Sequence, residues 1–156
     1  MKKENVYLFV LFLLTLFLDI FTKYLFESKQ FFESLFIHIR YSVNYGSAFG
    51  IFSSQSYYTE FVIALSVIIL LFLFKFRELF SNDNFQKLAL VFLAAGIIGN
   101  LYDRVVFGFV RDFISFGNLF IFNLADLYLT TAIILLFISE FKQSFLSKKS
   151  KSNAKF

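Results

Sequence analysis

Four long apolar segments constrain this chain more than any other feature of its sequence. They cover residues 6–25, 57–74, 86–102 and 123–141, and each approaches the roughly 20 residues that cross a bilayer core. Buried helices of a soluble protein would be the alternative, but four of them in 156 residues leave too little polar chain to cover such a core. The sequence therefore predicts an all-α membrane protein with four transmembrane helices, forming a single membrane domain over residues 1–156.

The composition agrees with a membrane protein and narrows the chemistry. Apolar residues make up 58% of the chain and the mean hydropathy is +0.71. The absence of cysteine excludes disulfides, thiolate metal sites and cysteine nucleophiles. A histidine-based triad would depend entirely on His38, which lies in a polar alternation more typical of a solvated strand.

The first apolar segment has two interpretations. Lys2 and Lys3 precede it, as the basic start of a cleavable secretory signal would. However, no small-x-small cleavage pattern follows, and Asp19 and Lys23 interrupt the segment in helical register. We therefore expect a retained first helix.

The distribution of Lys and Arg predicts the orientation. With the N-terminus inside, ten of these residues lie on the inner side and five on the outer side, which favours cytoplasmic N- and C-termini. Residues 26–56 and 103–122 then form the outer loops. Residues 142–156 form a basic tail, whose end we expect to be disordered and able to contact anionic lipid.

The outer loops contain strand and turn patterns. Residues 35–44 alternate with period two, as in a half-buried strand, and turn residues follow over 44–50. Residues 109–116 and 119–122 flank Gly117-Asn118 as a possible hairpin. We predict a small β platform on the outer face, with irregular aromatic loops as the alternative.

Polar residues cluster near the outer ends of the first and third helices. Asp19 and Lys23 share a helix face, and their spacing predicts a structural ion pair. Asn100, Asp103 and Arg104 share a face in the same way. Small residues that permit close helix contact come just before them, namely Ala94, Ala95, Gly96 and Gly99.

Two further carboxylates are the strongest candidates for a functional role. Asn123 is a good N-cap for the fourth helix, and Asp126 follows where free N–H groups and the helix dipole favour a carboxylate. Asp112 lies in the preceding loop. Capping or ion pairing can explain each polar group singly, but no basic partner is dedicated to Asp126. A carboxylate against lipid costs roughly 2.5–3.5 kcal/mol, so carboxylates near membrane segments are more typical of a functional role.

Five short motifs occur in order at the segment ends. They are Asp19-x-x-Thr22-Lys23, Asn44-x-Gly46-x-Ala48-Phe49, Gly99-Asn100-x-x-Asp103-Arg104, Gly108-x-Val110-x-Asp112-Phe113 and Phe122-Asn123-x-Ala125-Asp126. Together they resemble the lipoprotein signal peptidases (signal peptidase II), the bacterial intramembrane aspartyl proteases, from about Asp19 to Ile138. The chain departs from that pattern in three places. Ile20 stands where the family often has Gln, and Arg111 stands where an apolar residue is usual. The Pro often found upstream of Phe122-Asn123 is absent.

The resemblance implies the roles of individual residues. Asp112 and Asp126 would be the catalytic pair, sharing one proton because two close carboxylates cannot both ionise cheaply. Asp126, at a helix N-terminus, is the expected ionised member. The residues expected to bind substrate or shape the site are Asn44, Gly46, Asn100, Asp103, Arg104 and Asn123.

The resemblance also implies partners and location. The substrate would be a diacylglyceryl-modified prolipoprotein, cleaved just before its lipidated Cys, and cyclic lipopeptides of the globomycin type would inhibit. We expect a monomer in the bacterial cytoplasmic (inner) membrane, in contact with membrane lipids, with the active site toward the outer face. No metal, other cofactor or nucleic-acid partner is expected.

Two other function classes use similar residues. A small proton-coupled transporter would relay protons along intramembrane carboxylates, although here the four aspartates cluster toward one side. A metal-dependent lipid-head transferase would hold Mg²⁺ on clustered aspartates, although no dense Asp-x-x-x-Asp run occurs.

Overall fold

The computed structural model describes residues 3–27, 30–33, 37–46, 57–80, 83–116 and 120–153. Its elements are α1 (Lys3–Phe26), β1 (Gln30–Glu33), β2 (Ile37–Asn44), α2 (Tyr58–Lys75), η2 (Arg77–Phe80), α3 (Asn84–Phe107), β3 (Val110–Phe116), β4 (Phe120–Phe122) and α4 (Leu124–Asn153). Within this described part, α1 to α4 are each long and apolar enough to cross a membrane. The predicted four-helix membrane fold is confirmed, and the chain is a multi-pass membrane protein.

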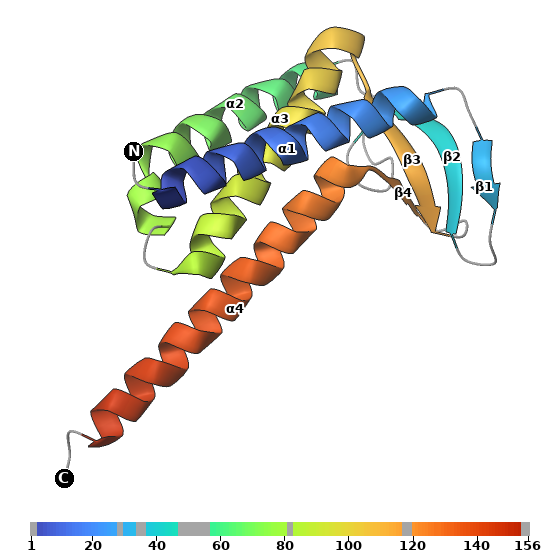
Figure 1. Cartoon of the computed structure of the whole chain (residues 1–156). Helices are drawn as coiled ribbons and strands as arrows, with labels where there is room; N and C mark the ends of the chain where they lie inside the picture. The colour runs from blue at the N-terminus through green and yellow to red at the C-terminus, as the bar shows by residue number, and fades with distance from the viewer. Residues whose placement is uncertain are drawn as a thin grey trace.

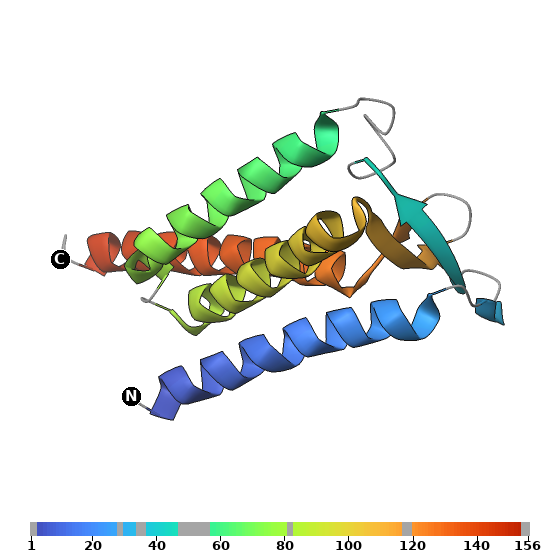
Figure 2. The same cartoon turned by 90° about the horizontal axis from the view of Figure 1, so that it is seen from above.

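The helices and the sheet occupy opposite ends of the molecule. Figures 1 and 2 show α1 to α4 extending away from the sheet, with α4 diverging from the other helices along its length. Both chain termini lie at the end opposite to the sheet. The junction between helices and sheet is therefore where side chains from all these elements can meet.

The sheet has four antiparallel strands in the order β1-β2-β3-β4. Its centre pairs β2 with β3, where Ser42 lies opposite Asp112 and Asn44 opposite Val110. Strands β3 and β4 pair as the expected hairpin, with Ile114 opposite Phe122. The predicted small β platform is confirmed, whereas residues 47–50 of the first predicted turn and the predicted turn at Gly117-Asn118 lie outside the described residues.

Helix boundaries follow local chemistry. Asp83 caps α3 by accepting a hydrogen bond from the Phe85 N–H at 3.4 Å, and Gly108 ends α3 with a left-handed φ of 79°. At the other end of the chain the structure differs from the prediction, because α4 continues to Asn153 through the expected basic tail. No Gly or Pro interrupts that segment, and Lys and Gln are good helix formers.

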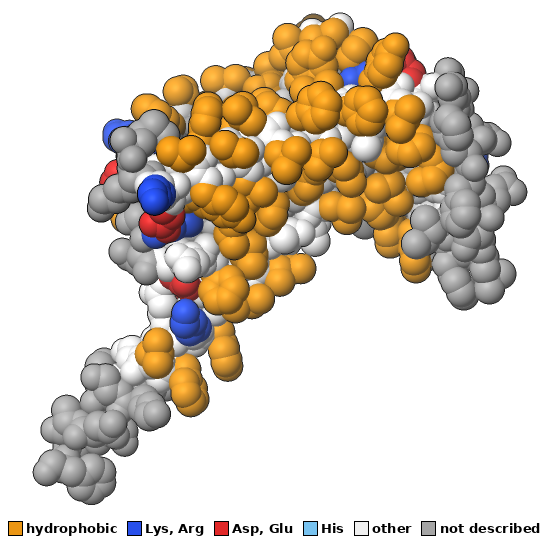
Figure 3. All heavy atoms as spheres, in the orientation of Figure 1, with side chains coloured by type: hydrophobic (Ala, Val, Ile, Leu, Met, Phe, Trp, Pro, Cys, Tyr) orange, Lys and Arg blue, Asp and Glu red, His pale blue; other side chains and the backbone are white. Residues whose placement is uncertain are grey.

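Large apolar side chains face outward, and a small set of charged side chains is buried. Phe137 is 73% exposed and Leu71 is 64% exposed, as expected for surfaces in contact with lipid. Figure 3 shows hydrophobic side chains covering the visible face of the helices, with charged side chains gathered towards its ends. The largest fully buried side chains are instead polar, namely Lys23, Asn123, Asp19, Asp103, Asp112 and Ser139.

Two glycines allow α3 to approach its neighbours closely, as the run of small residues predicted. A Cβ atom on Gly96 would lie 2.7 Å from the Ala125 carbonyl oxygen of α4. A Cβ atom on Gly99 would collide with the Asp19 carboxylate of α1. Close contact at Gly99 therefore places a buried carboxylate directly against the α3 backbone.

We predict that Gly99→Ala destabilises the protein by about 1–3 kcal/mol, because the added methyl group overpacks this contact. The measurement is thermal unfolding in detergent, with lipid-facing Val105→Ala as the control on the same helix. An unchanged melting temperature for Gly99→Ala would contradict the close contact.

Candidate active site

Two carboxylates from different elements meet where the sheet joins α4. Asp112 lies on β3, and Asp126 lies in the first turn of α4. Asn123 contacts both: its Nδ2 donates to Asp112 Oδ1 at 2.7 Å, and its Oδ1 accepts from the Asp126 backbone N–H at 3.1 Å. The structure thus brings the expected pair into one hydrogen-bonded unit.

The start of α4 fixes the position of Asp126. Asn123 is the N-cap, as its hydrogen bond to the Asp126 N–H confirms, and the Asp126 Oδ2 accepts in return from the Asn123 backbone N–H at 3.3 Å. This reciprocal arrangement is a capping box built from Asn and Asp. It holds the Asp126 carboxylate at the positive end of the helix dipole.

Asn100 supplies the contact from α3. Its Nδ2 donates to Asp126 Oδ1 at 2.9 Å, while its Oδ1 accepts from Asn123 Nδ2 at 3.1 Å. The same oxygen accepts from Lys23 Nζ at 3.0 Å. Asn100 and Asn123 therefore form a pair of linked amides between the two carboxylates.

Asn44 supplies the contact from β2. Its Nδ2 donates to Asp112 Oδ2 at 3.0 Å, and its Oδ1 accepts from the Gly46 N–H at 3.0 Å. Arg104 donates to the Gly46 carbonyl oxygen at 3.2 Å, which joins α3 to this end of β2. Asn44 thus contacts the Asp112 carboxylate directly, whereas Gly46 contacts Asn44 and Arg104 contacts Gly46.

Asp19, Lys23 and Asp103 lie together in a buried ion array behind the amides. Lys23 Nζ is 2.8 Å from Asp19 and 3.4 Å from Asp103, and all three side chains are fully buried. The other Asp19 oxygen accepts from the Ala125 N–H of α4 at 2.8 Å. The pair expected on α1 therefore also joins α1 to α3 and α4.

Arg111 completes this array and explains one departure from the sequence pattern. Its guanidinium is 2.8 Å from Asp103 and 3.3 Å from Glu27, and it lies over the Phe107 ring at 4.3 Å. Its backbone N–H also donates to Asp103 at 2.9 Å. Neighbouring side chains of a strand point to opposite faces, so Arg111 points away from Asp112.

Sequence reasoning did not identify the Arg111–Asp103 and Arg111–Glu27 contacts. Strand alternation was the available signal, because it separates Arg111 from Asp112, but it cannot specify which acids lie opposite. Glu27 follows α1 and is half-buried, with no motif around it. These contacts arise only from the packing of β3 against α1 and α3.

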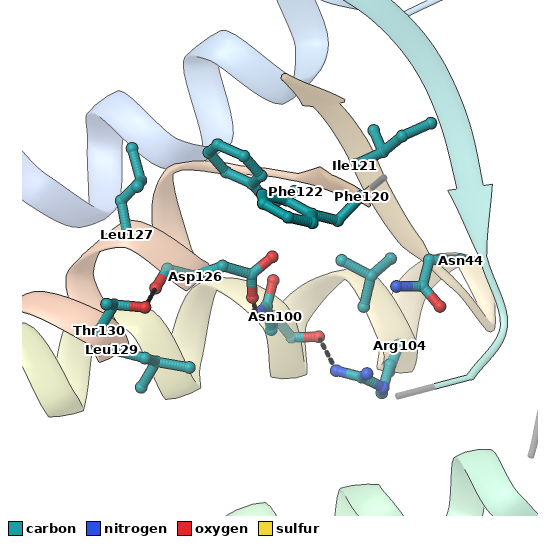
Figure 4. A pocket seen from close by; sticks show the side chains of 11 residues that line it. Asn44, Asn100, Arg104, Phe120, Ile121, Phe122, Asp126, Leu127, Leu129 and Thr130 are labelled. Carbon is teal, nitrogen blue, oxygen red and sulfur yellow. Dashed lines mark hydrogen bonds between the residues drawn. The ribbon is translucent and has the colours of Figure 1, made fainter. Parts of the chain in front are cut away.

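An apolar cavity of about 510 Å³ opens beside Asp126. Figure 4 shows Asp126, Asn100 and Arg104 in a row, with Phe120 and Phe122 on one side. The described residues that line it are Asn44, Asn100, Arg104, Val110, Phe120, Ile121, Phe122, Asp126, Leu127, Leu129 and Thr130. Such a lining suits an extended apolar ligand with a few polar atoms. Thr130 was not predicted, although its i,i+4 spacing from Asp126 gave a signal.

Burial, and after it the charge of Asp126, raise the pKa of Asp112 to about 7. Hydrogen bonds from Asn44 and Asn123 act in the opposite direction. Asp112 therefore holds its proton near neutral pH. Among the described residues, no group of three or more carboxylate, imidazole or thiol side chains is placed to hold a metal ion.

Comparison with known proteins supplies the family. Residues 11–142 match the family described as Signal peptidase (SPase) II. The chain belongs to the signal peptidase II family. It is an aspartic-type peptidase of that family, and a bacterial multi-pass membrane protein.

Individual relatives agree with this membership. The lipoprotein signal peptidase of Microcystis aeruginosa is 34% identical over 153 residues, which cover 90% of this chain and 96% of the relative. That of Dehalococcoides mccartyi is 40% identical over 127 residues, 78% of each chain. A solved structure described as a bacterial membrane enzyme superposes with a TM-score of 0.77 at 31% identity, covering 88% of both chains.

We predict that Arg111→Ala destabilises the protein by about 3–5 kcal/mol, because it leaves the buried Asp103 with one cation fewer. The measurement is thermal or denaturant unfolding of the purified protein in detergent. Arg40→Ala, at an exposed side chain of β2, is the matched control and should stay within about 0.5 kcal/mol. Equal stability of the two variants would contradict a structural role for Arg111.

Proposed function

We propose that this chain is an endopeptidase that removes signal peptides from diacylglyceryl-modified prolipoproteins, cleaving just before the lipidated Cys. Asp112 and Asp126 are its catalytic pair. The observation that carries the proposal is the hydrogen-bonded unit in which Asn123 joins these two carboxylates beside an apolar cavity.

The roles of the two carboxylates follow from their surroundings. Asp112 is the protonated member, since burial and the Asp126 charge both raise its pKa, and its proton polarises the scissile carbonyl. Asp126 is the ionised member and takes a proton from the attacking water. Asn44, Asn100 and Asn123 hold the pair in place through amide N–H groups.

The membrane placement is part of the same proposal. Both termini lie in the cytoplasm, the whole of residues 1–156 forms one membrane domain, and the active site faces the outer side of the cytoplasmic (inner) membrane. Both chain ends lie opposite to the sheet, which supports this arrangement. The enzyme acts as a monomer on a substrate that enters laterally from lipid, and cyclic lipopeptides of the globomycin type block the site.

Neither alternative function is favoured. The family match supports a peptidase, not a proton-coupled transporter. The same match gives a metal-dependent transferase no support.

We predict that Asp112→Asn and Asp126→Asn each lower cleavage of a lipidated precursor by about 10²–10⁴-fold or to below detection, because an amide can neither activate water nor supply the shared proton. The assay uses purified protein, with unfolding curves confirming that both variants fold. Chelation with EDTA is the control and should leave the wild-type rate unchanged. Substantial turnover by either variant would exclude the pair.

We predict that kcat/KM falls on the alkaline side with an apparent pKa near 7, because Asp112 then loses its proton and both carboxylates become ionised. The same group lowers stability as pH rises from about 3.9 toward 7, since the folded chain keeps a proton that an unfolded carboxyl releases. The measurement is a pH–rate profile in one detergent. A rate that still increases above pH 8 would contradict this assignment.

We predict that lipidated precursor is cleaved at least about 100-fold faster than the unlipidated form of the same sequence, because the acyl chains hold the cleavage point at the depth of the carboxylates. Each buried CH₂ contributes about 0.8 kcal/mol to that placement. The comparison is made in liposomes, with a cyclic lipopeptide as blocker. Equal cleavage of both forms, or proton flux without cleavage, would count against the mechanism.

A further inference from the structure

Lys23 has more contacts than an ion pair with Asp19 requires. Its ammonium is fully buried and lies 3.0 Å from Asn100 Oδ1 and 3.3 Å from the Gly99 carbonyl oxygen, in addition to its two carboxylate contacts. An ammonium group can only donate hydrogen bonds. The Asn100 side-chain atom that faces Lys23 must therefore be its oxygen.

This constraint passes through the two linked amides. With its oxygen turned to Lys23, Asn100 must present its Nδ2 to Asp126. The same oxygen also accepts from Asn123, so Asn123 must direct its Nδ2 toward Asn100 and Asp112. Its own oxygen is then left to accept from the Asp126 N–H. The buried cation and the groups of Asp126 thus require the same orientation of both amides.

We propose that Lys23 is a positioning residue of the reaction, which orients the Asn100 and Asn123 amides and through them holds Asp112 and Asp126. This inference rests on the proposed function of that pair. Without Lys23, the Asn100 oxygen loses its cationic donor, and the contact that holds the Asn100 side chain between Asp126 and Asn123 is removed. The amides then hold Asp126 less firmly beside the water that it activates.

The test separates positioning from stability by working in an Asp19→Asn background. That background removes the negative charge of residue 19 but keeps an oxygen that can accept from the Ala125 N–H. When Lys23→Met is added, no buried carboxylate at position 19 is then left without its cation. Within it, four proteins form a double-mutant cycle: the background itself, Lys23→Met, Asn100→Leu and the combination of both. For each, kcat and KM are measured on lipidated precursor, together with the unfolding curve.

Lys23→Met is expected to lower kcat by on the order of 10- to 100-fold, with KM changed less than about 3-fold, since the cavity lining is untouched. In the Asn100→Leu protein the same substitution should change kcat by less than about 3-fold, because the amide through which Lys23 acts is already absent. The proposal would be overturned if the kcat losses of the two single variants multiplied in the combined variant. An unchanged kcat per folded molecule in Lys23→Met would also overturn it.

The pH–rate profile provides an independent measurement. Burial and the Asp126 charge raise the pKa of Asp112, whereas the Lys23 charge lowers it, so Lys23→Met should move the alkaline limb to higher pH. Loss of folding alone would lower the amplitude without moving the limb, and that result would overturn the proposal. Asp112→Asn and Asp126→Asn are assayed in parallel. If both aspartate variants remain active, the proposed function fails. If both are inactive but the kcat losses of Lys23→Met and Asn100→Leu multiply in the combined variant, only the role of Lys23 is rejected.

Discussion

A single buried ammonium group connects most of the parts on which this structure depends. Lys23 reaches from α1 to the α3 backbone at Gly99 and to two α3 side chains, and its partner Asp19 accepts from the backbone of α4. A buried charge that loses its partners costs several kcal/mol, and water cannot replace them inside a membrane protein. The helices must therefore pack so that these groups meet, which makes the charge array a determinant of how α1, α3 and α4 come together.

The proposed catalytic pair lies beside the same polar region. Asp112 and Asp126 do not share in the ion array directly, because the amides of Asn100 and Asn123 lie between. This separation has a chemical benefit, because a lysine in direct contact with Asp112 would strongly favour its ionised form. The amides also favour the ionised form, but burial and the Asp126 charge outweigh them and raise the pKa to about 7. The buried ion pairs thus join the helices, whereas the neutral amides of Asn100 and Asn123 contact Asp112 and Asp126.

Much of the fold could be predicted because it depends on local sequence. Segment length predicts the four spans, period-two alternation predicts β2, and the Asn123 side chain predicts the start of α4. Two features differed or were missed for physical reasons. The end of α4 extends to Asn153 because nothing in the sequence breaks a helix there. The partners of Arg111 depend on which acids the neighbouring helix and loop bring to it.

By itself, the sequence determined which polar groups the membrane protein must accommodate and which neighbours they have along one element, since a helix or strand repeats at fixed spacing. The Asp19–Lys23 pair and the Asn123–Asp126 cap are of this kind. Only the tertiary structure decided contacts between elements, such as that of Lys23 with Asn100, 77 residues away. Such contacts depend on the packing of helices at their glycines. That packing sets which end of each amide faces each carboxylate, and it buries Asp112 so that its pKa rises.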